Sequence, residues 1–337
     1  MLLLWLAFLS LSAIIVYAGT HLSRYGDVIA EKTGMGRAWV GLILMAAVTS
    51  LPELITGLSS VTFADTPDIA LGDLMGSCVF NLSIIALMDI LQGRKPIFSR
   101  CEQGHILSAG LGIMLIGTAA LSILVSAQVP ALAHIGLYTP ALIVLYAVGI
   151  RAVFLFEKKK IAQFVAAAAE ASQYDHISTR TAVVRYTVNA LVIVVAATWL
   201  PVIGDRLAEA TGWGRSFIGT IFVAMTTSLP ELVVSVAALR IGAADMAIAN
   251  LFGINMFNML ILAVDDLFFM KGPLLSFVSM NHAVTGFIAI IMTGITVVSL
   301  TYRTEKKMFA RLGWDALALL LGYVINIYLL FSLRGRQ

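Results

Sequence analysis

The sequence predicts an all-α polytopic membrane protein, with ten transmembrane helices arranged as two inverted five-helix repeats in which helices 2 and 7 are broken. Hydrophobic residues make up 60% of the 337 residues and charged residues only 12%, unlike the composition of soluble domains. The mean hydropathy is +0.94. Ten apolar runs approach the roughly 20 residues that span a bilayer. The hexapeptide Thr-Ser-Leu-Pro-Glu-Leu occurs twice, at 49–54 and 227–232.

The apolar runs follow one another with short connections except in the middle of the chain. There, residues 157–180 form a long polar connection that separates an N-terminal repeat, 1–156, from a C-terminal repeat, 181–337. The first run lacks the basic start of a secretory signal and is long enough to span, so we expect it to be retained. The predicted spans are 1–20, 38–62, 68–91, 104–127, 132–156, 181–201, 216–239, 245–269, 277–301 and 313–333.

Positive charges in the connections predict the orientation. With the N-terminus outside, cytoplasmic loops hold all but five of the 22 lysine and arginine residues, as the positive-inside rule requires. Both termini are then outside and the 157–180 loop is cytoplasmic, and we expect the cell (inner) membrane of a prokaryote. The net charge of +3 is spread over loops rather than gathered on one face, so nucleic acid is not an expected partner. No pattern in the sequence predicts an oligomeric state.

Internal repetition reaches beyond the hexapeptide. At the same spacing as the two hexapeptides, Gly26-Asp27 matches Gly204-Asp205, and after a slip of one position, Phe80-Asn81 matches Phe257-Asn258. Repetition on this scale indicates a duplication. Because each half holds an odd number of spans, the second copy must enter the membrane inverted, an architecture typical of transporters.

Each hexapeptide places a proline and a glutamate deep inside a span. Proline cannot donate a backbone hydrogen bond and disfavours helix in the preceding residue, so the spans should break near Leu51 and Leu229. Ser50-x-x-Glu53 and Ser228-x-x-Glu231 also fit a capping box, an ordinary helix start. A helix start belongs at the membrane surface, but these positions lie about 12 residues, roughly 18 Å, inside their spans. We therefore favour breaks that line a cavity.

Two inverted copies bring both breaks together at the bilayer midplane. Glu53 and Glu231 there supply two negative charges, which would repel each other without a cation. Hard oxygen ligands select Ca²⁺, Na⁺ or Mg²⁺ over a soft metal. The site must therefore hold Ca²⁺, monovalent ions or protons, and their competition is a physical basis for exchange. Further oxygens come from the hydroxyls of Thr49, Ser50, Thr227 and Ser228 and from carbonyls around Ala46, Thr49, Ala224 and Thr227.

The third and eighth spans add side-chain amides beside the breaks. Asn81 and Asn258 occupy matched positions, and Ser77 lies four residues before Asn81, on the same helix face. Ordinary polar contacts between helices are the alternative interpretation. Their recurrence beside the broken helices favours a role as ligands.

Other acidic residues in the spans receive simpler interpretations. Asp73, matched by Asn250, is expected to make a contact between helices rather than to line a path for ions. Asp89, Asp265 and Asp266 lie near span ends, and we expect them to be solvated. The five histidines are scattered without the spacing of metal ligands.

The segments 38–91 and 216–269 resemble the two α-repeats of the cation/calcium exchanger (CaCA) superfamily, closest to its sodium/calcium exchanger branch. The repeated Thr-Ser-Leu-Pro-Glu-Leu is highly specific, and ten spans divided by a cytoplasmic loop also match. The resemblance implies that Glu53 and Glu231 are the central Ca²⁺ ligands. It further implies oxygen ligands from Thr49 and Thr227, Na⁺ sites formed by Ala46, Ala224 and Ser77, and a site centre completed by Asn81 and Asn258.

The sequence departs from the family pattern at several positions. Val48 and Thr226 stand where the repeats usually carry glycine. Ile254 replaces the serine of the family's Gly-Ser-Asn, which removes a hydroxyl expected to bind Na⁺ and leaves the counter-ion open. Leu54 and Leu232 follow the glutamates, whereas proton/calcium exchangers typically carry histidine there, which argues against that branch.

We therefore expect a secondary antiporter that exchanges Ca²⁺ for Na⁺ by alternating access at a midplane two-glutamate site. The family resemblance implies that the first and sixth spans move. Ca²⁺/H⁺ exchange, or exchange of another divalent cation, is the nearest alternative. A cation channel would conduct without coupling, and a membrane scaffold would tolerate loss of both glutamates. No nucleophile elbow, phosphate loop or hydrolase motif occurs, so we expect neither enzymatic activity nor a cofactor beyond the transported ions.

Overall fold

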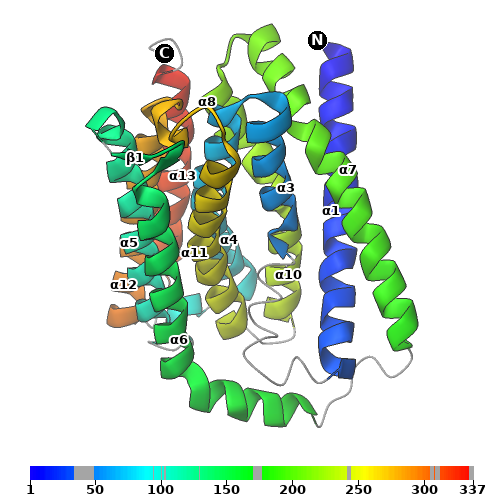
Figure 1. Cartoon of the computed structure of the whole chain (residues 1–337). Coiled ribbons are helices and arrows are strands. Elements are labelled where there is room, and N and C mark those ends of the chain that lie inside the picture. Colours follow the sequence, from blue (N-terminus) through cyan, green and yellow to red (C-terminus); the bar gives the residue numbers. More distant parts are fainter. Residues whose placement is uncertain are drawn as a thin grey trace.

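The computed structural model describes residues 1–33, 49–93, 95–99, 101, 104–128, 130–169, 177–240, 244–303, 307 and 312–333. These residues form one helical bundle with a short antiparallel hairpin, in which Ala131–Leu132 pairs with Ile135–Gly136 (Figure 1). The helices are α1 (Leu2–Thr33), α3 (Leu51–Ser59), α4 (Pro67–Gln92), α5 (His105–Leu124), α6 (Tyr138–Ala169), α7 (Thr179–Thr211), α8 (Arg215–Phe217), α9 (Ala224–Thr227), α10 (Leu229–Arg240), α11 (Ala244–Phe268), α12 (Asn281–Tyr302) and α13 (Trp314–Leu333).

Most predicted spans correspond to observed helices. In the described part of the chain, 8 helices are long and apolar enough to cross a membrane, and Arg215–Thr227 with Leu229–Arg240 makes up to 9 if counted as one bent span. That pair bends by 43° around Ser228, where the repeated proline predicts a break. The predicted span 38–62 falls partly outside the described residues, which resume at Thr49 with α3 and a π-helical turn, Ser60–Ala64.

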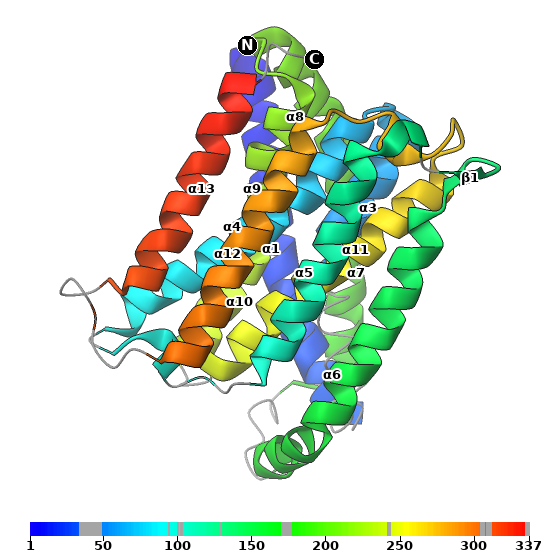
Figure 2. The same cartoon turned by 90° about the vertical axis from the view of Figure 1, so that its left-hand side faces the viewer.

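The two ends of the bundle differ in what they carry. The start of α1 and the end of α13 lie at one end, here called the terminal face, in two perpendicular views (Figures 1 and 2). The last part of α6 lies at the other end, here called the opposite face. Because α6 continues to Ala169, the first half of the connection predicted at 157–180 is helical rather than irregular.

Helix α4 runs through the centre of the bundle, and its backbone lies directly against the backbone around Thr220. A Cβ on Gly76 would lie 2.2 Å from the Thr220 carbonyl oxygen, and one on Gly72 would lie 2.9 Å from the Thr220 nitrogen. Thr220 belongs to a π-helical segment, Ile218–Val223, that leads into α9. Glycines one turn apart therefore let two backbones approach, as small residues do in membrane helix pairs.

The prediction that Asp266 and Asp89 are solvated is wrong, because connections fold over both. Asp266 is fully buried and accepts hydrogen bonds from the hydroxyls of Tyr138 (2.5 Å) and Thr139 (2.5 Å). It also accepts from two backbone N–H groups, those of Gly136 (3.0 Å) and Leu274 (2.6 Å). Asp266 thus fixes two loops at a helix end rather than facing solvent.

The surroundings of Asp89 repeat this arrangement at the opposite face. Asp89 is 1% exposed and accepts from the backbone N–H groups of Ile97 (2.7 Å) and Gly313 (3.2 Å). Lys307 forms a buried ion pair with it at 3.0 Å. This carboxylate also holds loops in place at a helix end.

Asp266→Asn is expected to destabilise the protein by about 3 kcal/mol, because the amide can replace only part of the acceptor capacity and leaves buried donors unsatisfied. Thermal unfolding in detergent measures the effect. Asp65→Asn is the control, since Asp65 is an exposed carboxylate paired with Lys271 at the same end, and such pairs contribute about 1 kcal/mol or less. Equal melting temperatures for both variants would contradict the assigned role.

Candidate functional site

Polar side chains from α3, α4, α9, α10 and α11 meet in the middle of the bundle. We call this set the central polar cluster. Each member is at most 3% exposed, so the cluster is closed off from solvent in the described residues. Its members are Thr49, Ser50, Glu53, Asp73, Ser77, Asn81, Thr227, Ser228, Glu231 and Asn258.

Ser228 joins three of the contributing helices. Its hydroxyl oxygen lies 3.1 Å from Oε1 of Glu53 on α3 and 2.8 Å from Oγ of Ser77 on α4, within hydrogen-bond distance of both. Residues 175 and 151 positions apart in sequence are thereby in contact, as the two-copy arrangement predicts.

The capping-box alternative is wrong for the first copy and unsupported for the second. Ser50 precedes α3, but its side chain makes no capping hydrogen bond, and its hydroxyl has no partner among the described residues. The Ser228 hydroxyl is directed to Glu53 and Ser77 instead of to the start of α10. The repeated serines are therefore members of the cluster rather than ordinary caps.

The backbone carbonyls differ from expectation at one predicted ligand. The Ala224 carbonyl accepts from the N–H of Ser228 (3.0 Å), so it is not freed by the break. The reason is geometric. The missing N–H of Pro230 would have donated to the carbonyl of residue 226, so the proline frees that carbonyl and not the carbonyl of Ala224. Ala46, the matching residue of the first copy, lies outside the described residues.

Acceptor oxygens in the cluster are left without partners. Among the described residues, neither carboxylate oxygen of Glu231 has a hydrogen bond, nor does Oε2 of Glu53. The side-chain oxygens of Asn81 and Asn258 are also unpartnered, although both amide nitrogens donate, to Asn255 (2.9 Å) and Cys78 (3.9 Å). Buried polar atoms are rarely unsatisfied, and a set made almost wholly of acceptors is suited to a hard cation.

Asp73 makes the predicted contact between helices. The Thr227 hydroxyl donates to its Oδ1 at 2.7 Å, which ties α4 to α9. Its Oδ2 has no partner among the described residues, and the side chain is fully buried. Asp73 is thus a third carboxylate at the edge of the cluster.

The cluster is chemically unequal on its two sides. Ser77 on α4 presents a hydroxyl that contacts Ser228, whereas Ile254 at the matched position of α11 is fully buried and apolar. The described residues include no group of three or more His, Cys, Asp or Glu close enough to hold one metal ion. A bound cation would therefore need hydroxyl, amide or carbonyl oxygens in addition to the glutamates.

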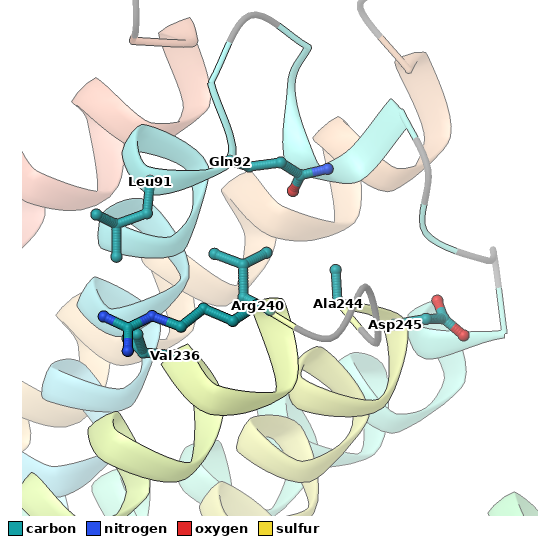
Figure 3. Close-up of a pocket in the computed structure, with 7 residues that line it drawn as sticks. Leu91, Gln92, Val236, Arg240, Ala244 and Asp245 are labelled. Carbon is teal, nitrogen blue, oxygen red and sulfur yellow. The ribbon is translucent and has the colours of Figure 1, made fainter. Parts of the chain in front are cut away.

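A separate pocket of about 410 Å³ lies at the opposite face, between the ends of α4 and α10 and the start of α11. In Figure 3 the Arg240 side chain extends towards Leu91 and Val236, while Asp245 projects on the far side of Ala244. Neither glutamate of the cluster lines this pocket.

Sequence reasoning missed two histidine–aspartate pairs. His105 Nε2 lies 2.7 Å from Asp245 Oδ1, and His282 Nε2 lies 2.9 Å from Asp68 Oδ1. At the spacing of the repeats His105 corresponds to His282 and Asp68 to Asp245, so a search for matched polar residues could have revealed both pairs. They lock α5 to α11 and α12 to α4, away from the cluster.

The chain is similar in sequence to known membrane proteins. A family model described as "Sodium/calcium exchanger protein" matches residues 3–156 and 181–332. Inner membrane protein YrbG of Escherichia coli is 25% identical over 256 residues, 74% of this chain and 74% of that protein. Sodium/calcium exchanger MaX1 of Methanosarcina acetivorans is 34% identical over 140 residues, 41% of this chain and 37% of that protein.

Solved structures share the fold at low sequence identity. The H⁺/Ca²⁺ exchanger CAX has a TM-score of 0.71 at 12% identity, covering 98% of this chain and 85% of that one. The sodium-calcium exchanger NCX_Mj, in one of its Na⁺ and Sr²⁺ soaks, has a TM-score of 0.61 at 20% identity, covering 97% of this chain and 99% of that one. The bundle is thus a known membrane exchanger fold.

Proposed function

Because the chain belongs to the sodium/calcium exchanger family, we propose that it is a secondary antiporter that exchanges Ca²⁺ for Na⁺ across the membrane by alternating access. The observation that carries the proposal is the buried pair Glu53 and Glu231 with three of its four carboxylate oxygens unpartnered among the described residues. Uncompensated carboxylates in a low-dielectric interior strongly attract cations. No chemical reaction is involved, so the protein acts as a transporter rather than an enzyme.

We propose the ligands from the buried polar residues that the repeated motifs bring together with this pair. Glu53 and Glu231 bind Ca²⁺ at the centre, and the oxygens of Asn81 and Asn258 complete its shell. Na⁺ occupies flanking positions that include Ser77. The remaining oxygens of the proposed site come from Thr49, Ser50, Thr227, Ser228 and Ala46, whereas the Ala224 carbonyl already accepts the N–H of Ser228 and is left out.

Ten spans in two inverted repeats are the proposed architecture, and reciprocal contacts support it. At the opposite face Asp89 accepts from the N–H groups of Ile97 and Gly313. At the terminal face Asp266, its counterpart in the second repeat, accepts from the N–H groups of Leu274 and Gly136. Ile97 matches Leu274 and Gly136 matches Gly313 at the same spacing. Each aspartate thus accepts one N–H from its own repeat and one from the other repeat, as expected for inverted copies. With cytoplasmic loops positive, the terminal face is outside.

Sodium is the proposed counter-ion, and protons are the second candidate. Ser77 offers a hydroxyl ligand for Na⁺ on one side of the cluster, but the apolar Ile254 offers none on the other. A site with one fewer Na⁺ ligand, and with two carboxylates able to carry protons, keeps Ca²⁺/H⁺ exchange as the specific alternative.

The counter-ion is tested with ⁴⁵Ca²⁺ uptake into proteoliposomes. Uptake should require Na⁺ loaded inside and should persist when the pH gradient is collapsed. Uptake driven by a pH gradient without Na⁺ would assign proton coupling. Uptake that needs neither gradient would exclude antiport.

Ser228→Ala is expected to raise the half-saturating Ca²⁺ concentration about tenfold. The substitution removes a hydrogen bond to a charged group, the one that holds Glu53 against α4 and α10. Initial uptake rates at varied Ca²⁺ measure the change. Ser235→Ala is the matched control, since Ser235 lies on α10 with a buried hydroxyl that has no partner among the described residues. A shift of equal size in both variants would contradict the positioning role of Ser228.

A further inference from the structure

We propose that Asp265 forms an additional cation-binding position on the path between the terminal face and Glu53. It would bind a hard cation, Ca²⁺ or Na⁺, before that ion reaches the central polar cluster. The proposal rests on the antiport function proposed above, and it adds a position to the path rather than a ligand to the central site.

Asp265 differs sharply from its neighbour in sequence. Asp266 accepts four hydrogen bonds, from Gly136, Tyr138, Thr139 and Leu274. Asp265 is equally buried, at 0% exposed, but neither of its carboxylate oxygens has a partner among the described residues. The prediction that Asp265 is solvated is therefore wrong. A buried carboxylate without a donor or a counter-charge is costly, and a mobile cation can supply the missing partner.

Its position places Asp265 next to the central cluster. The carboxylate lies against Gly57 of α3, where a Cβ would come within 2.3 Å of Oδ2 and 2.8 Å of Oδ1. Gly57 is one helical turn beyond Glu53, on the same face of α3 and towards the terminal face. The absence of a side chain at Gly57 is what makes room for the carboxylate one turn outside the site.

Asp73 is a further buried carboxylate in the central polar cluster. It interacts repulsively with both Glu53 and Asp265, and its Oδ2 is unpartnered among the described residues. These carboxylates do not form a compact group of metal ligands. Successive single-ion positions along a path therefore fit better than one site with several acidic ligands.

The opposite side of the cluster lacks matching acids. At the spacing of the repeats, Met88 corresponds to Asp265 and Asn250 to Asp73, so neither carboxylate has a counterpart. The pocket at the opposite face is lined instead by a cation, Arg240, and by Asp245, which is bound to His105. At these matched positions of the described residues, carboxylates therefore occur only on the Asp73 and Asp265 side of the cluster.

A one-sided acidic approach predicts a one-sided kinetic effect. Narrow apolar surroundings focus the field of fixed charges and raise local cation concentration and on-rate by about tenfold or more. Asp265 should therefore speed cation capture from the terminal face and have little influence on capture from the opposite face.

The test compares Ca²⁺ half-saturation in right-side-out and everted membrane vesicles that contain the full chain. Asp265→Asn, which keeps the side-chain shape, should raise the half-saturating Ca²⁺ concentration about tenfold from the terminal face and less than about twofold from the other. Asp65→Asn controls for general surface charge, since Asp65 is exposed at the same end. Gly57→Ala retains the Asp265 carboxylate but displaces it, and should also raise the half-saturating Ca²⁺ concentration from the terminal face alone.

The outcomes separate this inference from the proposed function. A higher half-saturating Ca²⁺ concentration from the terminal face alone supports the additional position. This result is expected in Asp265→Asn, or in Gly57→Ala if Asp265→Asn does not fold. Equal change from both faces, or no change from either, overturns it and leaves Asp265 as a buried carboxyl group without a role in cation capture. A wild-type protein without coupled flux in either vesicle type would instead overturn the antiport proposal itself.

Discussion

Glu53→Gln and Glu231→Gln are each expected to abolish Ca²⁺ transport and leave the protein folded. Glutamine nearly keeps the volume and the oxygen but removes the charge that a divalent cation needs at low dielectric. Breaking such a buried charge interaction costs about 3 to 5 kcal/mol, a loss of about a hundredfold or more in affinity. Measured ⁴⁵Ca²⁺ uptake should therefore fall to the level of empty liposomes.

The free energy of unfolding of these two variants should change little or should rise. Both oxygens of Glu231 and one of Glu53 lack partners among the described residues, so each neutral variant removes an uncompensated buried charge in cation-free protein. Glu209→Gln is the matched control, because Glu209 is an exposed glutamate on α7 with only a 3.5 Å contact to Arg215. Transport that survives in both site variants would exclude the two-glutamate site.

Gly76→Ala is expected to produce the largest structural defect. The added Cβ would lie 2.2 Å from the Thr220 carbonyl oxygen and 2.7 Å from the Ala224 Cβ, and a backbone oxygen cannot move aside as a side chain can. Separating α4 from the π-helical segment should cost about 3 kcal/mol. Because Ser77 and Thr227 lie beside this contact, transport should fall with stability.

Gly117→Ala is the control for the glycine substitution itself. The nearest atom to its added Cβ is Ile290 Cδ1 at 3.7 Å, an ordinary contact, and alanine favours helix by about 1 kcal/mol over glycine. Thermal unfolding and detergent gel filtration should therefore show a stable, monodisperse Gly117→Ala variant and an aggregated or early-melting Gly76→Ala variant. Equal behaviour of the two would contradict direct backbone packing at Gly76.

The sequence predicted what depends on local pattern. Runs of apolar residues at span length correctly located α4, α5 and α11 within a few residues, since a helix inside a bilayer must satisfy its own backbone hydrogen bonds. In the described residues one helix pair bends by 43° around Ser228, close to Pro230 of the second hexapeptide, and the matching break in the first copy stays a prediction. The exact repeat of the hexapeptide also predicted that the Glu53 and Ser228 regions would meet, and a 3.1 Å contact joins them.

The sequence could not predict features that depend on how distant segments fold over one another. Asp265 and Asp266 are adjacent and look alike in sequence, yet the carboxylate of Asp266 accepts four hydrogen bonds and that of Asp265 accepts none from the described residues. The difference comes from loops near Gly136 and Leu274, which only the tertiary structure brings to Asp266. The Ser50 capping box likewise fits the sequence, and only the folded structure shows that the bond is not made.

The central claim is that one buried site alternates between the two faces, and trans-stimulated ⁴⁵Ca²⁺ efflux tests it most directly. Proteoliposomes loaded with ⁴⁵Ca²⁺ are diluted into medium without Na⁺, at equal pH, with or without unlabelled Ca²⁺ outside. A Na⁺-coupled alternating site predicts efflux that is slow without external Ca²⁺ and strongly accelerated by it. Efflux that is equally fast without external Ca²⁺ would contradict this Na⁺-coupled site.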